Sequence, residues 1–190
     1  MAGATKNIVE FGVSEIHIGT YTVSDDGTVT MGAPVALPGA KSIALDPEGD
    51  ENKFYADDKV YWSGYSDNGF SGSIEVALFT DAFKTAFMGY ITLADGGVAA
   101  IRGADREKVY IAFQSKGDAL GRRGIMYNVT LGGIKREYAS IEEKKTPTTE
   151  SMDITVNGDN ATGISLVKYK EGDTGYDTLF TTPPVPTLPV

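Results

Sequence analysis

Residues that could carry out chemistry are few in this chain of 190 residues. Cysteine is absent, which excludes disulfides, thiolate metal ligands and cysteine nucleophiles. The one histidine, His17, alternates with Ile16 and Ile18 in a strand-like segment, and no serine has the sequence context of a nucleophile elbow. A lone histidine in a strand is far more often a packing or surface residue than a base. We therefore expect no catalytic residue, no cofactor and no enzyme activity.

Carboxylates are the one plentiful group, with 26 Asp and Glu against 17 Lys and Arg and a net charge of −9. A two-carboxylate glycosidase is formally open, but no pair stands out, and residues 25–26 and 57–58 fall where turns are expected. Residues 46–52 resemble an oxygen-rich cation loop without the spacing of an EF-hand, so we predict no metal site. The acidic balance also argues against a protein that grips nucleic acid.

The elements that would position these side chains are mainly β-strands. Apolar residues alternate with polar ones in several segments, which is typical of strands that bury one face and leave the other for water or a partner. The alternating apolar sets are Ile43 and Leu45; Ile74, Val76 and Leu78; Val109, Ile111 and Phe113; Ile125, Tyr127, Val129 and Leu131; and Met152, Ile154 and Val156.

Turns and one helix complete the predicted fold. Glycine-containing turns at residues 25–27 and 116–121 predict two hairpins. Residues 80–89 predict the single helix, capped by Thr80 or Asp81, with Ala82, Phe83, Ala86 and Phe87 on its apolar face. The sequence thus predicts an all-β domain with one packed α-helix, a β-sandwich or half-barrel, over residues 1–180. The first residues carry no secretory signal pattern and no segment is apolar enough for a membrane helix.

Two segments do not fit a compact domain. Residues 46–69 form a polar, acidic insertion, predicted as a long loop, that nevertheless carries Phe54, Tyr55, Tyr61, Trp62 and Tyr65. Exposed aromatic area on this scale calls for a covering partner. Residues 181–190 contain four prolines, which favour an extended arm, and Leu179, Phe180, Val185 and Leu188 would need a surface to lie on. Both segments indicate contacts between subunits.

The segment VALPGAKSIALDPEGDENKFYADDKVYW and its continuation NGFSGSIEVALFTDAF resemble the central signature of major tail proteins from long-tailed, non-contractile phages of Gram-positive bacteria. GRRGIMYNVTL, TESMDITV and the opening FGVSEIHIGTYT follow in that family's order, so the similarity covers nearly the whole chain. The resemblance implies a tail tube subunit whose hexameric rings close into a continuous β-barrel around a lumen. Rings stack, a long loop and terminal arms bridge them, and DNA passes through without specific binding into the host cell.

The resemblance also implies partners and a location: further copies of the chain, a tape measure protein, and terminator or distal tail proteins, in a virion assembled in the host cytoplasm. We expect no membrane partner. On these grounds we assign inter-ring stacking to six residues and the lumen wall to four. The stacking set is Asp46, Phe54, Tyr55, Tyr61, Trp62 and Tyr65, and the lumen set is Ser71, Ser73, Glu75 and Ala77. The alternative function is a β-sandwich carbohydrate-binding module that uses the aromatic residues between 54 and 65 to stack on sugars.

Overall fold

The computed structural model describes residues 12–117, 120–138, 140 and 147–188. Within these residues the chain forms thirteen strands and one short helix, so the predicted class, all-β with one helix, is confirmed. The strands are β1 Gly12–Val23, β2 Val29–Met31, β3 Val35–Leu37, β4 Ala40–Pro47, β5 Glu51–Ala56, β6 Lys59–Tyr65, β7 Phe70–Val76, β8 Ile91–Thr92, β9 Val98–Ala99, β10 Val109–Lys116, β11 Arg123–Lys135, β12 Glu150–Val156 and β13 Leu166–Tyr169, and the helix is α1 Asp81–Phe87.

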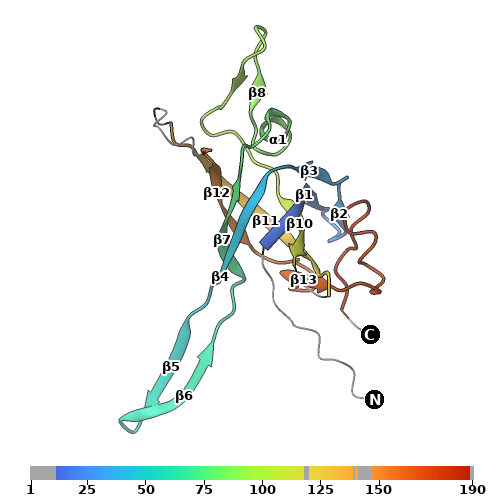
Figure 1. Cartoon of the computed structure of the whole chain (residues 1–190). Coiled ribbons are helices and arrows are strands. Elements are labelled where there is room, and N and C mark those ends of the chain that lie inside the picture. Colours follow the sequence, from blue (N-terminus) through green and yellow to red (C-terminus); the bar gives the residue numbers. More distant parts are fainter. Residues whose placement is uncertain (1–11, 118–119, 139, 141–146, 189–190) are drawn as a thin grey trace.

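Nine of the strands form one antiparallel sheet in the order β2-β1-β10-β11-β12-β7-β4, with β3 beside β1 and β13 beside β11. β2 and β4 are the terminal strands of this order, so the sheet is not closed into a barrel by the chain itself. The β5–β6 hairpin projects from one end of the molecule, and α1 with the β8–β9 pair lies at the other end (Figure 1). Both predicted hairpins are present, β1–β2 around residues 24–28 and β10–β11.

The main hydrophobic core is formed by inward side chains of strands from both parts of this strand order and by the helix. It joins Ile16 and Ile18 of β1 and Val109 and Ile111 of β10 to the inward side chains of β7 and β12. The alternation expected for 109–113, 152–156 and the pair Ile74–Val76 is confirmed. These side chains face the core because a strand turns successive residues to opposite faces.

β11 departs from the prediction because it contains a bulge. Asn128 adopts φ 50°, and the pairing with β10 shifts by one residue between Met126 and Val129. As a result Ile125 and Tyr127 face a second cluster, while Val129 joins the main core. The prediction that residues 125, 127, 129 and 131 share one face is therefore wrong, since a bulge reverses the alternation.

The second cluster covers the outer face of β1, β10 and β11, which the sequence left open for water or a partner. Tyr110, Tyr127 and the C-terminal Leu179 are fully buried in it. The hydroxyl of Tyr127 donates to the carbonyl of Pro184 at 3.0 Å, so residues 179–184 lie on their own domain. The expectation that Leu179 needs a partner surface is wrong; Val185 and Leu188 are exposed.

Arg123 holds this C-terminal segment in place. Its guanidinium lies 4.1 Å from the ring centroid of Tyr176 and 4.6 Å from that of Phe180, and it donates to the Tyr176 carbonyl at 2.7 Å. His17 stacks on the same Phe180 ring at 4.5 Å between centroids. The one histidine is therefore a packing residue, as predicted.

A buried carboxylate fixes the turn after β12. Asp159 accepts a hydrogen bond from the Tyr21 hydroxyl and others from the backbone N–H and the hydroxyl of Thr162, at 2.7 and 2.6 Å. Burial alone would raise the pKa of Asp159, but these hydrogen bonds outweigh it and hold the pKa below its ordinary value. The ionised carboxylate thus ties β1 to the segment that leads into β13.

The helix begins where predicted but buries fewer residues. Thr80 accepts from the N–H of Phe83 as the N-cap, and Phe83 and Phe87 pack into the main core, whereas Ala82 and Ala86 are exposed. Leu78 was predicted to lie inward with the β7 side chains, but β7 ends at Val76 and Leu78 is 59% exposed. The chain turns there, and Phe79 fills the core instead.

Candidate assembly surfaces

Residues 46–69 were predicted as a long loop, but most of them form a β-hairpin made of β5 and β6. The prediction that this segment lacks regular secondary structure is therefore wrong. Pairs run from Glu51 with Tyr65 to Ala56 with Lys59, with a bulge beside Tyr61. Asp57 and Asp58 form the tip, at φ 51° and 57°. Two consecutive residues with positive φ match a type I′ turn, which suits the twist of paired strands and which aspartate tolerates. The interpretation of 57–58 as turn residues is confirmed.

The hairpin exposes the five aromatic side chains that the sequence singled out. The most exposed is Tyr61, at 72%, and even Trp62, whose ring lies over Gly64, is 57% exposed. The Phe54 and Tyr61 rings meet edge to face with centroids 6.4 Å apart. The rings therefore gather on one two-stranded ribbon and are left uncovered by the described part of the chain, the arrangement that marks a contact site.

Asp46 does not join these aromatic residues. It is the last residue but one of β4 and pairs across the sheet with Ser71 of β7. Beyond it, backbone hydrogen bonds continue from the sheet into the hairpin: Glu48 exchanges bonds with Asn68 and Gly69, and the N–H of Ser66 donates to Asp50 at 2.9 Å. The hairpin is thus a continuation of β4 and β7 rather than a separate loop (Figure 1).

A second surface, which we call the polar face, is the outward side of β4, β7 and β12. Cross-strand rows place Ser42, Glu75 and Ser151 together, then Ala44, Ser73 and Asp153, then Asp46, Ser71 and Thr155. Three of the four predicted lumen residues, Ser71, Ser73 and Glu75, therefore lie on one face. Ala77 follows the end of β7 and is exposed beside Gly39.

Two of the acidic groups of the polar face, those of Glu75 and Asp153, are paired with lysines. Lys41 Nζ lies 2.6 Å from a carboxylate oxygen of Glu75, and Lys135 Nζ lies 2.8 Å from Asp153. Hydrogen bonds from Lys41 and from the Thr149 hydroxyl lower the pKa of Glu75 below its ordinary value. The polar face therefore combines small side chains with charges that largely cancel in pairs.

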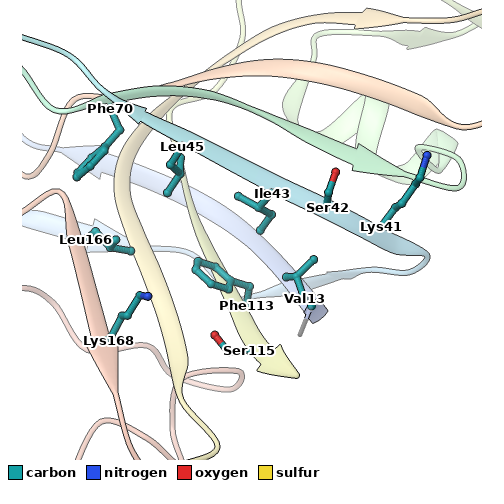
Figure 2. A pocket seen from close by; sticks show the side chains of 11 residues that line it. Val13, Lys41, Ser42, Ile43, Leu45, Phe70, Phe113, Ser115, Leu166 and Lys168 are labelled. Atoms are coloured by element: carbon teal, nitrogen blue, oxygen red, sulfur yellow. The ribbon is translucent and has the colours of Figure 1, made fainter. Parts of the chain in front are cut away.

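The unclosed sheet leaves a cleft of about 580 Å³ between β4 and the strands β1, β10 and β13. Figure 2 shows Ile43, Leu45 and Phe113 directed into it, and Lys41 and Lys168 also line it. Its polar lining consists of lysine and serine side chains, without a carboxylate or histidine. The cleft is the open end of the main core, and no catalytic pair lines it.

One exposed apolar region was not predicted from the sequence. Ile91 of β8, Leu93 directly after β8 and Ile101 shortly after β9 are each close to half exposed, and the exposed Leu78 precedes α1, which lies at the same end of the molecule (Figure 1). We call these four residues the end patch. The signal in the sequence was the Asp95-Gly96-Gly97 turn between Ile91 and Val98, which resembles the turn of a short hairpin.

The described residues hold no cluster of three or more His, Cys, Asp or Glu arranged to bind a metal ion. Over the same residues, no helix has the length and apolar character needed to cross a membrane.

Solved structures with a similar fold include components of contractile injection systems and of the anti-feeding prophage. The sheath/tube terminator of an extracellular contractile injection system, PVC, in its extended state, has a TM-score of 0.50 and 10% identity over 85% of this chain and 97% of its own. The cap that terminates the tube of the anti-feeding prophage has 0.49 and 11%, over 90% and 99%. The PVC sheath–tube complex has 0.48 and 11%, over 85% and 94%. No family model and no curated protein sequence matches the chain.

At this identity the likeness concerns the fold alone. This chain shares the fold of a tube-terminating component of a contractile injection system.

Proposed function

We propose that this protein is a structural subunit of a phage tail tube, in which copies form rings and rings stack into a conduit for DNA. The observation that carries the proposal is the β5–β6 hairpin, a two-stranded ribbon that displays five exposed aromatic side chains. An isolated hairpin of this kind is marginally stable in water, and its apolar area calls for a cover. Phe54, Tyr55, Tyr61, Trp62 and Tyr65 remain the proposed stacking set, whereas Asp46, which was assigned to it from the sequence, lies on the polar face.

Ring formation is supported by the open sheet. β4 is a terminal strand, and an unpaired strand edge invites pairing with another chain. Closure of six such sheets, the number that the family resemblance implies, would remove these edges and form a continuous barrel. The cleft beside β4 would then be covered by the neighbouring subunit.

The lumen assignment is supported by the composition of the polar face. The small, uncharged side chains of serine, threonine and alanine bind the phosphates of passing DNA only weakly. The carboxylates of Glu75 and Asp153 already have lysine partners. We propose that this face lines the channel, and that its pairing of charges, rather than repulsion by Glu75 alone, lets DNA pass without specific binding.

The fold match lies with contractile systems, whereas the sequence resemblance lies with non-contractile tails. A tube subunit is common to both, and that common role is the proposal. A tube terminator is the second candidate, because the structure with the highest similarity score among those described is a sheath/tube terminator. The two roles differ in outcome, since a terminator forms rings that do not stack repeatedly.

The test is assembly of the purified protein, followed by analytical ultracentrifugation and negative-stain imaging. Rings or hollow tubes are expected, and replacement of residues 48–68 by a short Gly-Ser link should leave a folded subunit that forms no tubes. A sharp monomer from micromolar to millimolar concentration would overturn the proposal, and glycan binding by that monomer would favour the carbohydrate-binding alternative. Single rings that never lengthen would favour the terminator.

A further inference from the structure

The molecule carries an uncovered apolar ribbon at each of two opposite ends. The β5–β6 hairpin lies at one end and the β8–β9 pair at the other (Figure 1). The hairpin exposes its aromatic rings, and Ile91 of β8, Leu93 directly after β8 and Ile101 shortly after β9 are also exposed. β8 and β9 pair over two residues each, Ile91 with Ala99 and Thr92 with Val98. So short a ribbon has no core of its own, so a partner that covers it would also stabilise it.

The placement of the two ribbons suits a head-to-tail contact. When two different surfaces of one molecule bind each other, the contact is heterologous and repeats in one direction without closing. When one surface binds itself, the contact closes after two copies and no stack grows. A chain that stacks thus needs two unlike surfaces at opposite ends, and the hairpin and the end patch are such a pair.

The distribution of charge also favours contact between the hairpin of one copy and the end patch of another. Residues 46–69 contain seven carboxylates and two lysines, a net charge of −5, so that two hairpins laid together would repel. Residues 77–108, which include the end patch, contain four acidic and four basic residues. Arg102, exposed next to Ile101, can meet the Asp57 or Asp58 carboxylate or an aromatic ring of the hairpin.

We propose that the end patch, Leu78, Ile91, Leu93 and Ile101, is the docking surface for the β5–β6 hairpin of a second copy of this chain in the next ring. The inference rests on the proposed stacking function and names the surface that receives the hairpin. Tyr61 and Trp62 of one copy cover the aliphatic side chains of the other, and both ribbons lose their exposed apolar area.

Two variants, each blocked at one end, test this arrangement. Ile91→Asp/Leu93→Asp blocks the end patch, and Tyr61→Thr/Trp62→Thr blocks the hairpin while retaining residues that favour strands. All four side chains are exposed, so circular dichroism should show folded subunits. The concentration needed for stacking should rise roughly 100-fold for each variant alone, because each loses two anchor side chains.

Mixing the two variants supplies the decisive observation. One variant has an intact hairpin and the other an intact end patch, so the mixture should form a two-variant complex that does not lengthen, seen by sedimentation and imaging with one variant tagged. The matched control is Val35→Asp, which changes a side chain of 43% exposure on β3, close to the 44% of Leu93. It should stack as the unchanged protein does.

Three outcomes overturn the inference in distinguishable ways. If Ile91→Asp/Leu93→Asp stacks normally while deletion of the hairpin prevents stacking, the hairpin docks elsewhere and the tube proposal stands. If the hairpin-blocked variant stacks alone, Tyr61 and Trp62 are not needed for stacking, and the hairpin does not dock through these side chains. If the unchanged protein forms no stacks, the tube proposal fails together with this inference.

Discussion

Tyrosine occupies two opposite situations in this molecule. In the body, Tyr110 and Tyr127 are fully buried between the sheet and the C-terminal segment, and their hydroxyls donate to the carbonyls of Gly32 and Pro184. In the β5–β6 hairpin, Tyr55 and Tyr61 are largely exposed. The first pair contributes to folding of the subunit. The exposed pair in the hairpin contributes little to folding. If the proposed function is correct, its role is to join subunits.

The sharpest way to break this comparison is to remove the same side chain from each region. Tyr127→Ala should lower the free energy of unfolding by about 3–5 kcal/mol, the usual cost of deleting a buried aromatic side chain. Tyr61→Ala should change it by less than about 0.5 kcal/mol, as is usual for an exposed position. Urea unfolding of the two variants measures both values. Equal destabilisation by the two substitutions would contradict the distinction.

A second substitution, at the buried carboxylate of Asp159, measures how much a buried polar contact stabilises the subunit. Asp159→Asn should destabilise the subunit by about 1–3 kcal/mol at neutral pH, because the ionised group accepts from Tyr21 and Thr162. Its pKa is lowered on folding, so this contribution is present above the unfolded pKa of about 3.9 and is lost as the pH falls through the lower folded value. The difference between the two proteins should therefore shrink below about pH 4, which denaturant unfolding at several pH values would reveal. A constant difference would show that the charge of Asp159 is not involved.

A smaller effect is expected at the contact between the body and its C-terminal segment. Arg123→Ala removes the stacking on Tyr176 and Phe180 and the bond to the Tyr176 carbonyl, at a cost of about 1–2 kcal/mol. Residues 170–188 should then become accessible to protease before the sheet does, as mass spectrometry of limited digests would show. Arg123→Lys keeps the charge but lacks the planar guanidinium. Its loss of stability should therefore be smaller than that of Arg123→Ala but still measurable against the unchanged protein. Uniform digestion of the whole chain would contradict a local role.

The smallest effect on the subunit and the most specific one on the tube is expected from Glu75→Arg. The change places a second cation beside Lys41 on the polar face and raises the charge by two per subunit. Tubes should still assemble, but DNA should bind or pass with a new dependence on salt, since each neutralised phosphate adds about −0.9 to the slope of log affinity against log salt. Glu107→Arg, at an exposed position outside that face, is the control. Ejection or binding that is unchanged at every salt concentration would place Glu75 outside the channel.

The sequence predicted the class of fold because period-two patterns and turn residues are local signals. Ile74, Val76, Met152 and Ile154 face the core as their alternation requires, and the helix starts at Thr80 as its hydroxyl requires. The bulge at Asn128 could not be predicted, since nothing in the alternation of 125–131 shows that one residue will be skipped. The hairpin was predicted as a loop because its polar and aromatic residues lack a simple alternation.

Long-range contacts account for the other errors. The burial of Leu179 depends on Tyr110 and Tyr127, which lie far away in sequence, and the proline pattern of the C-terminal segment conceals that contact. The pairing of Glu75 with Lys41 and Thr149 likewise joins three separate strands or turns. For the candidate surfaces, residue type predicted which side chains are exposed on the hairpin, but not that Asp46 lies apart on the polar face.

The unbroken path from β4 and β7 into the hairpin has a mechanical consequence. A force pulling on the Asp57–Asp58 tip along the strands would pass down both strands of the hairpin into β4 and β7 and load the hydrogen bonds between β7 and β12 in shear, many at once. A hairpin attached through a flexible loop would only swing under the same force. The subunit thus passes tension from the hairpin tip through the terminal strand β4 and its neighbour β7 into the rest of its sheet, and a stack of such subunits would bend as one rod.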